Sequence, residues 1–86
     1  MEKQMTPAEA WQDFMVEVWP LVRAGLNRNE RREVSTAQRD FEGKRNDRSG
    51  KPITLGPERI ARLLERFAPG RYRVERSDPV FWVKIN

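Results

Sequence analysis

Three arginines recur at helical spacing in the last third of the chain. Arg59, Arg62 and Arg66 stand at positions i, i+3 and i+7, so on a helix they line one side. A row of guanidinium groups on a rigid helix can contact successive phosphates, and each neutralised phosphate makes binding more dependent on salt. The alternative is a solvated helix flank, on which Glu58 and Glu65 balance the arginines.

A second group of cations surrounds a tryptophan near the C-terminus. Basic side chains interleaved with an aromatic ring can hold a nucleic-acid backbone while a base stacks on the ring. Trp82 could instead pack across strands against Arg73, or be buried against another segment or subunit. Together the two groups form the predicted nucleic-acid-binding set, which is Arg59, Arg62, Arg66, Arg71, Arg73, Trp82 and Lys84.

Carboxylates gather near the N-terminus. Glu9, Asp13 and Glu17 stand at i, i+4 and i+8 and would form an acidic ridge on a helix. Three carboxylates alone make a poor site for a hard cation, so no metal is expected. The ridge is either the wet face of an amphipathic helix or a docking surface for a basic partner, including a second copy of this chain.

Side chains for catalysis are scarce. The 86 residues include no Cys and no His, which excludes disulfides, thiolate or imidazole zinc sites, thiol nucleophiles and histidine acid–base chemistry. No serine is spaced with an activating base, and the glycines are too scattered for a phosphate-binding loop. We therefore expect a non-enzymatic protein without a cofactor.

The charge is distributed unevenly. Residues 1–27 carry two basic and four acidic side chains, whereas residues 28–86 carry 15 basic and nine acidic ones, for a net charge of +4. The basic part favours a polyanionic partner, DNA or RNA, although a charged surface also serves solubility. No uncharged apolar window could span a bilayer and no apolar run follows the N-terminus, so we expect no membrane association and a cytoplasmic location.

Two N-terminal helices are predicted. Thr6 begins a capping box that opens a long amphipathic helix over about 7–25, and Pro20 predicts a kink or a restart within it. A second helix over about 30–43 could be capped at Asn27 or at Ser35. Its apolar stripe is thin, so we expect it to lie on the surface as the least stable element.

The second half of the chain predicts a loop, a helix and a hairpin. Residues 42–52 contain no aliphatic or aromatic side chain and indicate a flexible basic loop, and a third helix is predicted over 57–68. Alternation on both sides of Ser77 and Asp78 predicts a two-stranded antiparallel hairpin. A turn centred there pairs Val74 with Phe81, Tyr72 with Val83 and Arg73 with Trp82.

The expected fold is a single small α+β domain over 1–86. The order of third helix, strand, turn and strand is similar to the second half of a winged helix-turn-helix. That family has a short turn before its recognition helix, where this chain has residues 42–52, so we do not assign it there. The expected core is Trp11, Phe14, Met15, Val18, Val22, Ile60, Leu64, Phe67, Tyr72, Val74, Phe81 and Val83.

Two functions remain open at this point. The first is a small basic nucleic-acid-binding or regulatory module that contacts phosphates through the third helix and the hairpin. The second is a protein–protein interaction module, an inhibitor or adaptor, that uses the same arginines or the Glu9, Asp13 and Glu17 ridge. A homodimer is compatible with either function.

Overall fold

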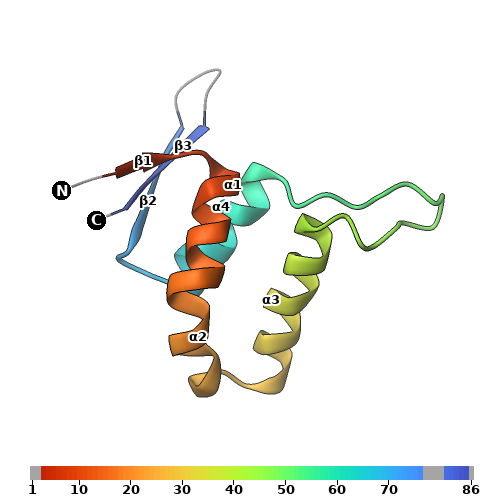
Figure 1. Cartoon of the computed structure of the whole chain (residues 1–86), viewed down its shortest axis with the longest axis horizontal. Helices are drawn as coiled ribbons and strands as arrows, with labels where there is room; N and C mark the ends of the chain where they lie inside the picture. Colours follow the sequence, from red (N-terminus) through yellow and green to blue (C-terminus); the bar gives the residue numbers. More distant parts are fainter. Residues whose placement is uncertain (1–2, 77–80, 86) are drawn as a thin grey trace.

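The chain forms an α+β domain with a small sheet on one side and helix α3 on the other (Figure 1). This computed structural model describes residues 3–76 and 81–85, with the backbone alone for 3, 76 and 81–85. The elements are β1 Lys3–Met5, α1 Pro7–Asp13, the π-helical segment η1 Phe14–Val18, α2 Trp19–Val22, the short helix η2 Arg23–Gly25, α3 Arg28–Phe41, α4 Pro57–Phe67, β2 Tyr72–Arg76 and β3 Phe81–Ile85.

The sheet has three antiparallel strands in the order β1, β3, β2. The prediction of only two strands is therefore wrong, because β1 precedes the first helix and pairs with β3, for example Met5 with Val83. A strand of three residues is too short for period-two alternation to reveal it. By pairing with β3, it covers an edge that a two-stranded hairpin would leave open.

The strand register differs from the predicted one by two residues. Val74 pairs with Val83, Arg73 with Lys84, and Glu75 with Trp82. The ladder ends at Arg76 and resumes at Phe81, which places four residues between the strands. Pro79, one of the four, has no amide hydrogen to give to a ladder. The predicted turn at Ser77 and Asp78 lies outside the described residues.

The first helical path runs from residue 7 to residue 25, as the apolar stripe predicts, but it changes type along the way. The Thr6 capping box is present, with the Thr6 side chain accepting from the Glu9 amide. Pro20 has no amide hydrogen and its ring crowds the carbonyl four residues earlier, and the helix accommodates it with the π-helical turn η1 just before α2. The kink predicted at Pro20 thus takes the form of a wider turn.

Helix α3 begins earlier and packs more tightly than predicted. Asn27, rather than Ser35, is the cap, in a capping box with Glu30, and the helix ends at Phe41 before Gly43 in the left-handed region. Val34 and Ala37 are completely buried, so α3 belongs to the core and is not merely a surface helix.

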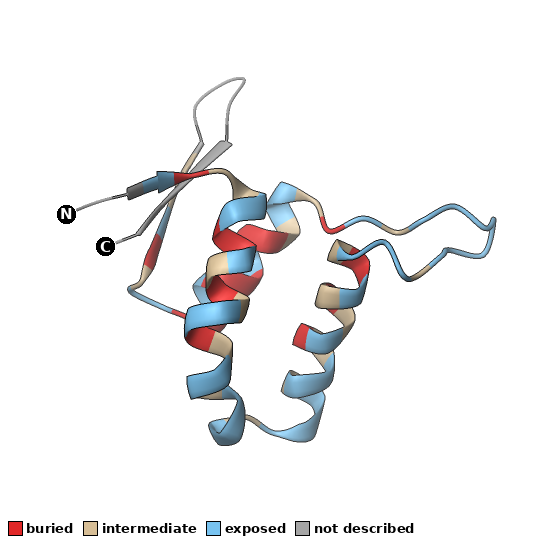
Figure 2. Cartoon of the chain, in the orientation of Figure 1, coloured by how far each residue is buried: buried red, intermediate tan, exposed pale blue. Residues whose placement is uncertain are grey.

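The core lies where α1 and η1 meet α4 and the inner side of α3 (Figure 2). Of the predicted core, Met15, Val22 and Val74 are only partly buried and pack at its margin, and the side chains of Phe81 and Val83 lie outside the description. The prediction missed eight residues that the tertiary contacts bury, four of them alanines, namely Met5, Ala10, Val34, Ala37, Leu55, Ala61, Leu63 and Ala68.

Candidate nucleic-acid interface

The predicted arginine row on α4 lies along one groove. Arg59, Arg62 and Arg66 line a depression of about 410 Å³ together with Glu33 of α3 and Leu63. The prediction that the three arginines share one side of the helix is therefore confirmed. Their availability for phosphates depends on what they already bind.

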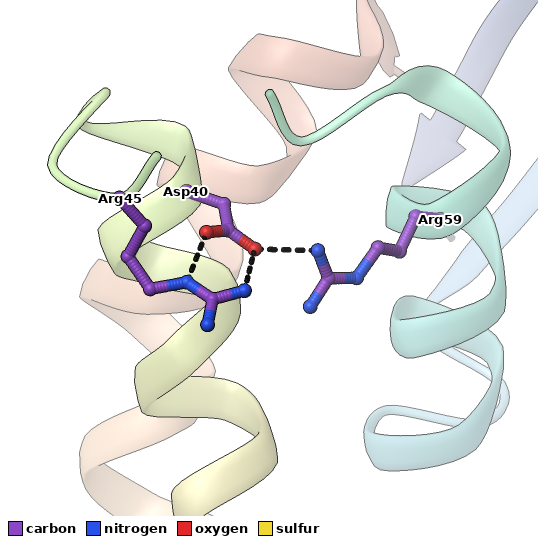
Figure 3. A network of polar contacts seen from close by, with 3 residues as sticks. All are labelled: Asp40, Arg45 and Arg59. Atoms are coloured by element: carbon purple, nitrogen blue, oxygen red, sulfur yellow. Dashed lines mark hydrogen bonds and ion pairs between the residues drawn. The ribbon is translucent and has the colours of Figure 1, made fainter. Parts of the chain in front are cut away.

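Arg59 is held by a buried carboxylate. The Asp40 side chain is 0% exposed, and it accepts from Arg45 Nε at 2.6 Å and from Arg59 Nη1 at 2.6 Å (Figure 3). We call Asp40, Arg45 and Arg59 the Asp40 cluster. The hydrogen bond from Arg45 outweighs burial and, with that from Arg59, lowers the pKa of Asp40 below its usual value. The cluster joins the end of α3, the following segment and the start of α4.

Arg66 is also paired, whereas Arg62 is not. Arg66 Nη1 donates to both carboxylate oxygens of Glu33, at 2.6 and 3.0 Å, and its guanidinium lies over the Phe67 ring. Arg62 is exposed and makes no hydrogen bond or ion pair with any residue that the structure describes. Two of the three arginines are thus paired, with carboxylates of α3 instead of the predicted Glu58 and Glu65.

The two hairpin cations whose side chains the structure describes, Arg71 and Arg73, both have acidic partners. Arg71 Nη2 lies 3.3 Å from Asp13 Oδ2, and Arg73 lies 3.6 Å from Glu75. The backbone of Lys84 pairs with Arg73, while Trp82 pairs with Glu75, so the predicted placement of Trp82 opposite Arg73 is wrong. The side chains of Trp82 and Lys84 lie outside the description, and their proposed stacking and phosphate contacts stay predictions.

The acidic ridge is divided among different tasks. Asp13 is half-buried and accepts from both Arg71 and Tyr72, and Glu9 belongs to the Thr6 capping box. Glu17 is exposed on η1. Within residues 3–76 and 81–85, no group of three or more acidic side chains could hold a metal ion.

Tyr72 provides a direct spectroscopic test of this corner of the fold. Burial, and then the hydrogen bond to Asp13, raise the pKa of Tyr72 well above its usual value near 10. Because it is the one tyrosine in the sequence, phenolate absorbance reports on it alone. We expect almost no phenolate in the folded protein at about pH 10.5, and mostly phenolate in guanidinium chloride at the same pH.

The control for this titration is Asp13→Asn, which removes the charge that disfavours the phenolate and should bring the native titration closer to the normal range. Since the folded pKa of Tyr72 is raised, the folding stability it contributes is complete below about pH 10 and falls above it. Half-ionisation of the native wild-type protein near pH 10 would contradict the buried Tyr72 and Asp13 contact.

The outer face of α3 carries arginines that lie outside the predicted nucleic-acid-binding set. Arg28, Arg32 and Arg39 are about one and two helical turns apart, on the side opposite Val34 and Ala37, and all three are exposed. We call these three the α3 stripe; Arg31, also exposed, adjoins it. None of the four has a hydrogen-bond or ion-pair partner among the residues described.

The carboxylates of α3 explain why the stripe stays unpaired. Glu30 accepts from the Asn27 amide, Glu33 binds Arg66, and Asp40 is buried in its cluster. All three lie away from the stripe, which is therefore free of compensating charge. The sequence shows the helical spacing of Arg28, Arg32 and Arg39. It does not show that the acidic residues of α3 bind other parts of the protein instead of these arginines.

An apolar depression lies elsewhere on the described surface. It measures about 440 Å³, between η1 and the end of α3, and is lined by Gln12, Met15, Val16, Gln38, Phe41 and Glu42.

Among the described residues, no helix combines the length and apolarity needed to cross a membrane. No protein-family model, curated protein or solved structure matches this chain.

Proposed function

We propose that this protein is a small, non-enzymatic nucleic-acid-binding module of the cytoplasm that contacts phosphates through the α3 stripe and Arg62. The observation that carries the proposal is the separation of charge on α3. Its carboxylates are engaged in internal contacts, while its arginines face solvent without a partner among the residues that the structure describes. The proposal retains Arg62 from the α4 row and moves the other principal contacts from α4 and the hairpin to α3.

The helix dipole does not account for the arginines at the start of α3, although it favours Arg39 in the last turn. Arg28 is the first residue of α3 and Arg31 is the fourth, so both lie within or next to the first helical turn. A cation at a helix N-terminus opposes the helix dipole, at a cost of about 0.3 to 1 kcal/mol near the surface. Arginine at these positions is better explained by an anionic ligand, because guanidinium groups bind phosphate oxygens in pairs of hydrogen bonds.

The shape of the surface fits a phosphate backbone better than a single anion. The α3 stripe extends over 12 residues, with about 16 Å of helix rise between Arg28 and Arg39, which is long enough to meet several phosphates in a row. Arg62 lines the groove together with Glu33. Its helix, α4, runs antiparallel to α3, because the end of α3 contacts the start of α4 through Asp40 and Arg59, and Glu33 contacts Arg66 further along. The groove is lined by Arg62 but by none of the three stripe arginines, which lie on the outer face of α3.

The proposal predicts the behaviour of the double variant Arg32→Ala, Arg39→Ala. The wild-type protein should bind labelled duplex DNA or RNA in fluorescence anisotropy, with affinity that falls log-linearly from about 50 to 300 mM salt. Loss of two phosphate contacts should weaken binding roughly 30-fold and make the slope for B-form DNA shallower by about 1.8.

A matched variant separates the stripe from net charge. Arg23→Ala with Arg73→Ala also removes two exposed cations, neither of which belongs to α3, and should keep most of the affinity. Both variants should unfold within about 0.5 kcal/mol of the wild type, since the side chains are on the surface. Equal losses in the two variants, or wild-type affinity in the α3 variant, would refute the assignment of the contacts to α3.

A protein–protein interaction module is the second candidate, and the apolar depression favours it. Val16, on its rim, is 69% exposed and Leu21 on α2 is 81% exposed. Large apolar side chains at such exposure can anchor a partner, and binding built on them depends little on salt. A salt-insensitive complex that Val16→Asp abolishes would support this candidate over nucleic-acid binding.

A further inference from the structure

The segment between α3 and α4 has a defined shape although nothing packs on its tip. We call residues 44–52 the arm. Asp47 and Lys51 close it through the Asp47 amide and the Lys51 carbonyl at 2.8 Å, and Asn46 forms an isolated bridge with Pro52. The arm projects from the end of α3, away from the body of the protein (Figure 1).

The turn of the arm is built around one carboxylate. Asp47 Oδ1 accepts from the Ser49 amide at 2.8 Å, the Ser49 hydroxyl at 2.6 Å and the Lys51 amide at 3.0 Å. Gly50, with φ of +85°, supplies the left-handed residue that the turn requires. These contacts, first the Ser49 side chain, lower the pKa of Asp47, so its carboxylate is ionised and engaged at neutral pH.

Because Asp47 is engaged inside the turn, the tip offers cations alone. Arg48 and Lys51 are exposed, and neither side chain has a hydrogen-bond or ion-pair partner in the part of the chain described. Lys44, at the start of the arm, is paired with Glu42 at 3.0 Å. The arm thus resembles α3, in that its acidic side chain, Asp47, makes hydrogen bonds within the protein while Arg48 and Lys51 are exposed to solvent.

The base of the arm is fixed to the helices that carry the proposed interface. Arg45 is part of the Asp40 cluster, and its carbonyl accepts from the Ile53 amide at 2.8 Å. The buried carboxylate therefore holds the arm, the end of α3 and the start of α4 together (Figure 3). The arm leaves α3 on the side away from α1 (Figure 1), and the spacing of the α3 stripe places it on the side of α3 opposite the buried Val34 and Ala37.

We propose that the arm is a second phosphate-contacting element and that a double-stranded nucleic acid lies in the corner between the arm and the α3 stripe. This inference rests on the proposed function and names its ligand. Residues 44–48 reach about 16 Å in extended form, similar to the length of the stripe, so the corner has two basic sides of comparable size. A rigid duplex can present its two backbones to both sides at once.

Preorganisation is the physical advantage of the arm. A disordered segment loses conformational freedom when it binds, whereas the Asp47 turn already holds Arg48 and Lys51 in place. The geometry therefore contributes to affinity in addition to the charge, and the two contributions can be separated by experiment.

The test uses two variants of the full chain and labelled duplex DNA, duplex RNA and single strands. Arg48→Ala with Lys51→Ala should weaken duplex binding roughly 10- to 30-fold and make the slope for B-form DNA shallower by about 1.8. Asp47→Ala raises the net charge by one, yet it should weaken duplex binding about three- to tenfold because the turn is lost. Single strands should bind more weakly than the preferred duplex.

Different outcomes overturn the two proposals. Wild-type affinity and slope in the Arg48 and Lys51 variant, together with a loss in the Arg32 and Arg39 variant, would overturn the arm and leave the proposed function in place. Tighter binding by Asp47→Ala would overturn the preorganised arm in favour of net charge. No binding of the wild-type protein to any nucleic acid at about 50 mM salt would overturn the proposed function itself.

Discussion

Replacement of Asp40 by alanine is expected to lower the free energy of unfolding by about 2 to 3 kcal/mol at pH 7. Removing one partner of a buried ion pair costs about 3 to 5 kcal/mol because the other charge is left without compensation. Here the loss is smaller, because the Arg45 and Arg59 side chains are 36% and 33% exposed and water can reach them. Asp40→Asn preserves the shape of the side chain and should cost less.

The contribution of Asp40 should also depend on pH. Its pKa is lowered in the folded protein, chiefly by the hydrogen bond from Arg45, so the folded state favours the ionised form. The stabilisation is therefore complete above the unfolded value of about 4 and is lost as the pH falls through the lower folded value. We expect the stability difference between wild type and Asp40→Asn to be constant from about pH 7 to 5 and to shrink below about pH 4.

The control is a neighbouring carboxylate with a surface partner. Glu42 pairs with Lys44 at 3.0 Å, with both side chains solvent-accessible, so Glu42→Gln should change the unfolding free energy by less than about 0.5 kcal/mol. Urea denaturation followed by circular dichroism measures all three variants. If Asp40→Ala and Glu42→Gln lose equally little, the Asp40 cluster does not stabilise the fold as its burial implies.

The helix boundaries could be predicted where a local signal fixes them. Thr6 with Glu9 and Pro57 at a first helical position mark the starts of α1 and α4, because capping depends on residues within one turn. The start of α3 had two local solutions, Asn27 and Ser35, of equal quality. Tertiary contacts decide between them, since the chosen start leaves Val34 and Ala37 inside the helix and in the core.

The availability of charged side chains could not be predicted from spacing. Arg59 and Arg66 were chosen because they share a helix face, yet their partners Asp40 and Glu33 lie 19 and 33 residues away in the sequence. Asp40 itself gives no local signal of burial, because a lone aspartate in a polar helix is normally exposed. The same long-range pairs remove the acidic groups of α3 from its outer face and leave its arginines as the accessible cations.

Trp11→Ala is expected to have the largest effect on stability, about 3 to 5 kcal/mol. Trp11 is completely buried, its ring centroid lies 5.3 Å from that of Phe14, and its indole nitrogen donates to Gln38 Oε1 of α3 at 2.7 Å. A domain of 86 residues has a total stability of roughly 4 to 13 kcal/mol, so this loss would unfold a measurable fraction of the protein. Denaturation followed by circular dichroism at equilibrium gives the value.

Smaller substitutions separate the contribution of the hydrogen bond to stability from the contribution of packing. Trp11→Phe keeps most of the aromatic contact but leaves the Gln38 oxygen without its donor, whereas Trp11→Phe with Gln38→Leu removes both polar partners and should recover part of the loss. Trp19→Phe is the control, because Trp19 is only partly buried and should cost less. Equal stability of the two Trp11→Phe proteins would show that the hydrogen bond contributes little.

Trp11 also connects the core to the proposed interface. Its bond to Gln38 holds α3 against α1, and α3 carries the stripe and the base of the arm. A protein weakened at this contact should lose duplex affinity in proportion to its unfolded fraction, and a stabilising osmolyte should restore binding. The Arg32 and Arg39 variant should not respond to the osmolyte, because it lacks the contacts rather than the fold. The same osmolyte response in both proteins would show that Arg32 and Arg39 act through folding and not through phosphate.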